Sequence, residues 1–385
     1  MSEVAPECDK YWKGALNWLI SVAQSDERGH VYWYMSTSAP KGHPNRRISI
    51  PGMSHVIRMF LAGYERCGDG RYRETALAAT RTLVERCARR RRTRFGTGYA
   101  WSGSYRPNGR PPGLLAGHSH GLGNLIDTLL DAYGATRDDR LRAELRLAET
   151  MPDLELSDGT TPLSMADGSL RYVMSAAREA RGGYVWPYMR HEAKSKNIGY
   201  GSGTGGIGWA LLRGARANHK ADPEFAAECM PYANGAATYA VNMVLGYQRT
   251  APLPNPGGDA GFGVCGGVGG AGHFLMLCAD AVAPRDGDLV GRIRAAIEKI
   301  ANLVAGSAVE IDGALACPDW RHFKRINIAL DYGQTGVVLG LAAAGKYLDN
   351  PELIDAAKKV ADYMAQRAVR EGDGYKFAQF HPLAR

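Results

Sequence analysis

Residues 199–241 read GYGSGTGGIGWALLRGARANHKADPEFAAECMPYANGAATYAV. The stretch opens with a burst of glycines, continues as an apolar run, and then breaks at a short charged link before a second amphipathic run. Glycine lets a helix begin abruptly and approach its neighbours closely, because it has no side chain. In the link, Pro223 stands at or near the first position of the second helix, where a missing amide hydrogen costs nothing. The corresponding links at 68–72, 136–140 and 348–352 each place an Asp or Asn to cap the second helix. The stretch therefore predicts two helices joined by a tight turn.

The same order of features recurs along the chain, which indicates a repeat architecture. Five segments share it, and they begin at Pro51, Gly117, Gly199, Gly261 and Asp331. Such repeats bury a continuous core by stacking on one another. No stretch shows sustained alternation of Val, Ile and Thr, so no long strand is expected, although short hairpins in the loops remain open. The sequence thus predicts an all-α protein.

The ends of the repeat decide between an open and a closed stack. An open solenoid requires polar capping repeats, whereas here the last repeat is as apolar as those in the middle. We therefore expect an α/α toroid (barrel) of five to seven helix pairs, forming a single domain over residues 1–385. Helices over 11–23 and 351–367 are expected near the two ends of the chain, and an additional helix near 165–180.

Composition narrows the class of protein. The chain has 385 residues, 45% of them hydrophobic, with 48 glycines and a formal net charge of +8. Seven scattered cysteines, with no short-spaced pair, argue against a disulfide framework or a structural zinc site. The start of the chain lacks the features of a signal peptide, and no apolar run is long enough for a membrane span. We expect a cytoplasmic protein that binds neither membrane nor nucleic acid.

The run Arg89–Arg92 carries part of the positive charge. A run of this kind is typical of the solvated end of a helix, where the helix dipole favours cations. The alternative is a docking surface for an acidic partner, such as a phosphate or an acidic peptide. Nucleic acid is not expected there, because no aromatic residues interleave with the arginines.

The glycine bursts also support a family resemblance. Ser119-His120-Gly121-Leu122-Gly123, the opening Trp18-Leu-Ile-Ser-Val-Ala and the link Gly68-Asp-Gly-Arg-Tyr-Arg together resemble the lanthionine synthetase C-like family. That family has an α/α-toroid fold, and its enzymes add peptide cysteines to dehydroalanine or dehydrobutyrine to close thioether rings. The resemblance covers residues 15–364 and implies the same fold here.

Two of the three zinc ligands of that family have no counterpart in this sequence. At the position of its Cys-His-Gly motif stands Cys265-Gly266-Gly267, which lacks the histidine. At the position of its other cysteine stands Tyr200-Gly201, which has no thiol. A catalytic zinc needs three protein ligands and an open position. We therefore expect no metal and no other cofactor.

Residues at the starts of the repeated helices are the candidate site. His120 is expected to act as the acid–base group and to face the central cavity, unlike His273, which is interpreted as a core histidine. The other catalytic candidates are His118, Cys265, Asp331 and Tyr332, and the substrate-binding candidates are Tyr200, Trp186, Arg90 and Arg91. A thiol at the start of a helix has a lowered pKa, which is why Cys265 is included.

The leading hypothesis is a zinc-independent lanthipeptide-type cyclase. Its substrate would be a dehydrated precursor peptide with a leader, and separate peptide-modifying enzymes, a kinase or a lyase, are further candidate partners. One alternative is a carbohydrate-active α/α-toroid enzyme, a hydrolase, lyase or epimerase. Such an enzyme is expected to need a pair of carboxylates across the cavity, and only Asp331, with Asp259 nearby, offers a carboxylate at a burst, so this alternative ranks second. The other alternative is a non-catalytic peptide-binding scaffold.

Overall fold

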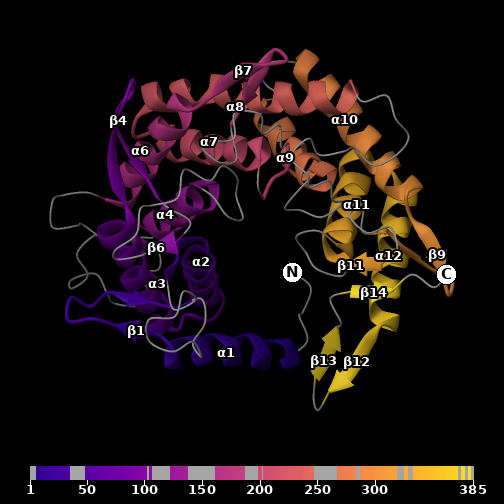
Figure 1. Ribbon diagram of the computed structural model, residues 1–385, viewed down its shortest axis with the longest axis horizontal. Helices are drawn as coiled ribbons and strands as arrows, with labels where there is room; N and C mark the ends of the chain where they lie inside the picture. The colour runs from indigo at the N-terminus through magenta and orange to yellow at the C-terminus, as the bar shows by residue number, and fades with distance from the viewer. Residues whose placement is uncertain are drawn as a thin grey trace. The chain divides into compact units, whose positions relative to one another are not determined.

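The computed structural model of the chain (Figure 1) describes most of it. The described residues are 6–34, 48–101, 104–105, 122–137, 161–186, 198–201, 203–246, 267–282, 287–318, 325–327, 333–371, 374–377 and 380–382. They fall into two compact units. Unit 1 comprises Met1–Leu114 with Asn124–Ser175, and unit 2 comprises Leu115–Gly123 with Ala176–Arg385. No helix within these ranges is both long and apolar enough to cross a membrane.

Unit 1 is built from helices and short hairpins. Its helices are α1 (Pro6–Ser21), α2 (Ile50–Cys67), α3 (Gly70–Thr82), the π-helical turn η1 (Leu83–Cys87), α4 (Leu122–Arg137) and α6 (Pro162–Ser175). Its antiparallel strand pairs are β1 (Gln24–Ser25) with β2 (Val31–Tyr32), β3 (Ile48–Ser49) with β6 (Ser104–Tyr105), and β4 (Arg89–Thr93) with β5 (Gly96–Ala100). Only the first two residues of α4 are grouped with unit 2.

The link between α2 and α3 forms as the sequence predicts. Gly68 adopts a left-handed conformation, with φ of 71°, and donates its amide hydrogen to the carbonyl of Tyr64. Asp69 then caps α3 by accepting a hydrogen bond from the amide of Arg71. α2 is also tied to α4, because Arg58 donates to Asp131 at 2.8 Å and lies 3.8 Å from the fully buried carboxylate of Asp127.

The arginine run is a strand and not the end of a helix. The residues of Arg89–Arg92 pair with residues of β5, and all four side chains are exposed. β5 packs against α6, where a Cβ atom at Gly98 would lie 3.1 Å from the side chain of Tyr172. The interpretation as a helix end is therefore wrong. It failed because a run of identical residues carries no alternation, and the pairing that makes it a strand comes from β5.

Unit 2 consists of two layers of helices. Its helices are α7 (Thr204–Asn218), α8 (Pro223–Leu245), α9 (Gly267–Val282), α10 (Gly287–Gly306), α11 (Gln334–Leu348) and α12 (Pro351–Gln366). α7, α9 and α11 contact one another in series and form the first layer. α8, α10 and α12 do the same and form the second layer (Figure 1). Each helix of the first layer also packs on the helix that follows it in sequence.

The glycine burst of α7 permits its contact with α9. A Cβ atom added at Gly208 would lie 2.3 Å from the ring of Phe274 and 2.9 Å from the Cβ atom of Ala236. At Gly205 it would lie 3.2 Å from Phe274. Real Cβ atoms are not found at the shorter of these distances, so the close approach of α7 to α9 requires glycine at 208. This confirms that the burst serves close packing.

Short hairpins follow α6, α10 and α12. β7 (Arg178–Ala180) pairs with β8 (Gly183–Val185), and β9 (Val309–Ile311) with β10 (Ala314–Ala316). β12 (Ala368–Glu371) pairs with β13 (Gly374–Phe377), and β11 (Arg325–Asn327) pairs with β14 (Phe380–Pro382). The helix expected near 165–180 is present as α6, but it ends at Ser175 because β7 begins three residues later.

Candidate functional site

Several predicted site residues lie outside the described part of the chain. These are His118, His120, Cys265, Asp331 and Tyr332. Their convergence on one cavity, and the acid–base role of His120, remain predictions. The site is therefore built from the described residues that lie close to the starts of α7, α9 and α11.

Tyr200 and His273 meet in unit 2. Tyr200 precedes α7, and His273 lies in the second turn of α9. Their rings touch edge to face, with centroids 5.4 Å apart and planes at 88°. Both side chains are partly buried. The structure thus joins a predicted substrate-binding residue to a histidine that the sequence placed in the core.

His273 has a second, apolar environment. It borders a small cavity of about 20 Å³ between α9, α10 and α11, together with Gly272, Met276, Ile300 and Val337. A cavity of this size holds at most about one water molecule. The imidazole therefore lies between an aromatic ring and an apolar wall, a setting that restricts its movement.

The starts of α7 and α11 share an open construction. Gly203 and Gly333 are extended residues at the N-cap positions, and neither provides a side chain to cap the helix. Thr204, at the first position of α7, is fully buried, and its hydroxyl has no hydrogen-bond partner among the residues that the structure describes. The first amide hydrogens of such helices point away from the helix and favour negatively charged or oxygen-rich groups.

Gln334 fixes the start of α11. Its side chain is buried, accepts a hydrogen bond from the amide of Cys317 at 2.9 Å and donates one to the carbonyl of Cys317 at 2.6 Å. The side-chain amide of Gln334 thus pairs with both the backbone N–H and the backbone carbonyl of Cys317, the residue that follows β10. This bond holds the first turn of α11 against the hairpin β9–β10 and makes it a rigid part of the candidate site.

Acidic residues are scarce at these helix starts. The helices that follow the glycine bursts, α2, α4, α7, α9 and α11, have no acidic residue in the first turn. Within the described ranges, no group of three or more His, Cys, Asp and Glu side chains is arranged to hold a metal ion. Chemistry at the described helix starts must therefore rely on other groups, and at the starts of α7, α9 and α11 the described histidine is His273, a residue type suited to proton transfer near neutrality.

The buried thiols are unsuited to nucleophilic work. Burial raises the pKa of Cys87 and of Cys317 to about 12, and raises that of Cys278 well above its usual range. A thiol is reactive as the thiolate, so these three side chains remain protonated and inert near neutrality.

The other predicted substrate-binding residues lie elsewhere. Trp186 is only 1% exposed and packs near Tyr184, with ring centroids 6.5 Å apart, so it forms part of the core of unit 2. Arg90 and Arg91 lie on β4 in unit 1, with their side chains exposed.

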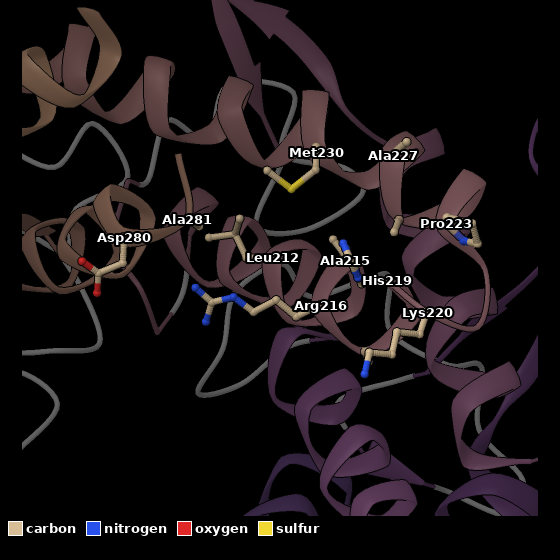
Figure 2. A pocket seen from close by; sticks show the side chains of 12 residues that line it. Leu212, Ala215, Arg216, His219, Lys220, Pro223, Ala227, Met230, Asp280 and Ala281 are labelled. Atoms are coloured by element: carbon tan, nitrogen blue, oxygen red, sulfur yellow. The ribbon is translucent and has the colours of Figure 1, made fainter. Parts of the chain in front are cut away.

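A groove at the other end of α7 was missed by the sequence analysis. It has a volume of about 770 Å³ and lies where the end of α7, the start of α8 and the end of α9 meet (Figure 2). Arg216, His219, Lys220 and Asp280 line it together with apolar side chains. The spacing of the three basic residues was visible in the sequence, but the concavity depends on three helices and was not.

Comparison with known proteins shows the fold. No family model and no curated protein matches the sequence. Among solved structures, a sugar epimerase from a ruminal bacterium matches with a TM-score of 0.59 and 16% identity, over 97% of this chain and 90% of that one. Cellobiose 2-epimerase from Bacillus thermoamylovorans matches with a TM-score of 0.56 and 14% identity, over 97% and 91%.

A third match is the GH76 α-mannanase of Bacteroides thetaiotaomicron, with a TM-score of 0.54 and 12% identity, over 98% of this chain and 89% of that one. These structures confirm the predicted fold class, an all-α protein of the α/α-toroid type. At such low identities they show the fold alone. The single domain over residues 1–385 remains a prediction.

The resemblance to the lanthionine synthetase C-like family is wrong, and so is the thioether-forming cyclase inferred from it. The similar solved structures are carbohydrate enzymes. The error has a physical cause, because the glycine bursts encode helix packing, as Gly208 against Phe274 shows. Any toroid with closely packed helices requires this packing, whatever reaction it catalyses. The peptide partners expected with the cyclase stay untested.

Proposed function

We propose that this protein is a carbohydrate-active enzyme that moves a proton on a sugar, as an epimerase or an isomerase. The fold supports the proposal, since two of the similar structures are a sugar epimerase and a cellobiose 2-epimerase. The observation that carries it is the pair of His273 and Tyr200 at the first layer of unit 2. This is the carbohydrate alternative of the sequence analysis, narrowed to one type of reaction.

Such a reaction needs one well-placed proton acceptor. The base removes the proton from the carbon next to the carbonyl of an open-chain sugar, which leaves an enediolate. Return of a proton to the opposite face of that carbon gives the epimer, and return to the neighbouring carbon gives the isomeric ketose. A positioned histidine can take the proton and return it on its own face of the enediolate, which is enough for isomerisation. Epimerisation also requires the enediolate to turn, so that its other face meets the same histidine. In our proposal His273 has this role, and Tyr200 orients its ring.

The charges at the helix starts support proton transfer over glycoside hydrolysis. Hydrolysis generally uses two carboxylates on either side of the scissile bond. The first turns of α2, α4, α7, α9 and α11 provide none. An enediolate carries negative charge on oxygen, which backbone amides at helix starts such as that of α7 can stabilise.

The test is proton exchange on neutral sugars. The full chain is incubated with mannose, glucose or cellobiose in heavy water, and nuclear magnetic resonance follows deuterium at the carbon next to the carbonyl and the appearance of a new sugar. We expect both signals with at least one sugar. Release of monosaccharides from mannan without such exchange would contradict the proposal and favour a hydrolase.

The role of His273 has its own prediction. His273→Asn should lower the exchange rate by roughly 10² to 10⁴-fold, the usual contribution of one positioned acid–base group. Tyr200→Phe, which keeps the ring contact, should cost much less than Tyr200→Ala. Tyr347→Phe on α11 serves as the control for a tyrosine change, and circular dichroism checks that each variant folds. If His120→Asn abolishes exchange while His273→Asn does not, the proton acceptor is His120 instead.

A further inference from the structure

The groove at the end of α7 has a basic face. Arg216, His219 and Lys220 stand at positions i, i+3 and i+4, which places them on one side of the helix end. All three side chains are exposed, and none makes an ion pair or a side-chain hydrogen bond with another described residue. Cations are favoured at a helix C-terminus. The helix dipole therefore accounts for basic residues at the end of α7, but it does not require that their side chains line a groove.

The floor of the groove is apolar. Leu212 and Ala215 of α7 are buried, as is Ala226 of α8, and Met230 is partly exposed beside them. The volume of about 770 Å³ lies within the range of ~300–1,000 Å³ that small-molecule sites occupy. Figure 2 shows Arg216 and Asp280 toward one end of the groove, and Lys220 and Pro223 toward the other.

Asp280 limits the kind of ligand that fits. Its exposed carboxylate lines the same groove as the three basic residues. A carboxylate accepts hydrogen bonds from hydroxyl groups and repels a second negative charge. The combination of three basic residues with one carboxylate therefore disfavours a polyanion, such as an acidic peptide or a nucleic acid. It suits a ligand with one anionic end and a neutral body that carries hydroxyl groups.

We propose that this groove binds a phosphorylated sugar at a site separate from the one around Tyr200 and His273. The ammonium of Lys220, with the side chain of His219, binds the phosphate at one end of the groove, and the guanidinium of Arg216 donates to hydroxyls of the sugar at the end near Asp280. The hydroxyls of the sugar donate to Asp280, and the C–H face of its ring lies on Leu212 and Met230.

The two sites are far enough apart to be occupied together. Thr204 and Arg216 stand twelve residues apart on one helix, which at 1.5 Å per residue is about 18 Å. A sugar phosphate in the groove therefore does not block the helix starts. The groove is an additional binding site and not an extension of the candidate active site.

Calorimetry of the full chain tests the proposal. The probes are mannose 6-phosphate, mannose and inorganic phosphate, each titrated separately. The sugar phosphate should bind at least tenfold more tightly than either of the others. The double variant Arg216→Gln with Lys220→Gln should weaken its binding at least tenfold. Lys359→Gln, which removes an exposed cation from α12, is the matched control and should leave the affinity unchanged.

A second variant separates the phosphate from the sugar part. Asp280→Asn removes the carboxylate, so it should strengthen the binding of inorganic phosphate and reduce the preference for the sugar phosphate. No saturable binding of mannose 6-phosphate, or binding that the double variant leaves intact, would overturn the proposal. Equal affinity for inorganic phosphate and the sugar phosphate would also overturn it, because the groove would then be a simple anion site.

The test does not depend on the proposed catalytic activity. His273→Asn should retain the full affinity for mannose 6-phosphate, because His273 lies on a different part of α9 from Asp280. If no sugar shows proton exchange but the groove binds as expected, the proposed function fails and this inference stands. If proton exchange occurs but the groove does not bind mannose 6-phosphate, the proposed function stands and this inference fails.

Discussion

His30 is a buried side chain of unit 1 that joins two carboxylates. Its Nδ1 atom lies 2.9 Å from an oxygen of Asp26, and its Nε2 atom lies 2.8 Å from an oxygen of Glu85 in η1. Arg86 also lies 3.2 Å from Asp26. These contacts connect the turn before β2 to the π-helical turn that ends α3.

The same contacts predict how stability depends on pH. The hydrogen bond from His30 is the main cause that lowers the pKa of Asp26 from 3.8 to about 2. A carboxylate whose pKa is lower in the folded state stabilises it above its unfolded pKa, and this contribution is lost as the pH falls through the folded value. Asp26→Asn should therefore lower the melting temperature at neutral pH, and the difference from the wild type should shrink between pH 4 and pH 2. If the variant and the wild type differ in melting temperature by the same amount at pH 4 and at pH 2, the stabilising contribution assigned to the Asp26 carboxylate is refuted.

Gly208 provides a second test at the scale of single residues. Gly208→Ala should destabilise the protein by about 1–3 kcal/mol, the usual cost of forcing atoms into a packed core, because its Cβ atom would overlap Phe274 and Ala236. Gly291→Ala on α10 is the matched control, since a Cβ atom there meets nothing within 4 Å. That change should stabilise by up to ~1 kcal/mol through helix propensity. Chemical denaturation measures the free energy of unfolding of both variants. If Gly208→Ala leaves that free energy unchanged, α7 and α9 can separate at low cost.

At the scale of elements, local signals located the helices well. Asp69 and Asn350 cap α3 and α12 as the sequence predicts, and Pro223 and Pro351 occupy early positions of their helices. A cap and a proline act over three or four residues, so they can be read directly from the chain. The short hairpins, which the sequence left open, could not be located in it because two to five residues give too little alternation to detect.

The cap of α12 allows a quantitative check. The side chain of Asn350 accepts hydrogen bonds from the amides of Glu352 at 3.0 Å and Leu353 at 3.4 Å. Asn350→Ala should therefore lower the free energy of unfolding by about 1 kcal/mol. Asp355→Ala on the same helix removes only an exposed ion pair with Lys358. It should change the free energy of unfolding by less than about half the loss expected for Asn350→Ala. Equal losses in the two variants would mean that the cap contributes nothing specific.

At the scale of the whole molecule, the sequence predicted the class of fold but not the contact between Tyr200 and His273. Repeated glycine bursts and caps are enough to indicate stacked helix pairs. Tyr200 and His273 are brought together only by the packing of α7 on α9, and no local pattern records that contact. The sequence also ranked His273 as a core residue, because an apolar run surrounds it. The functional error arose in the same way, since glycines that serve packing were read as the signature of one enzyme family.

The turn between β9 and β10 has a practical consequence for protein engineering. Asp312 and Gly313 both have positive φ, 54° and 78°, and nothing lies within 4 Å of where a side chain on Gly313 would begin. The hydrogen bond from Arg367 to Asp312 ends on an exposed carboxylate, and an ion pair at the surface contributes little to stability. A short insertion between Asp312 and Gly313 should therefore be accommodated at the tip of the hairpin, with the pairing of Gln334 with Cys317 retained. A fluorescent label or an affinity handle placed there would report on the protein while leaving both the groove and the helix starts free.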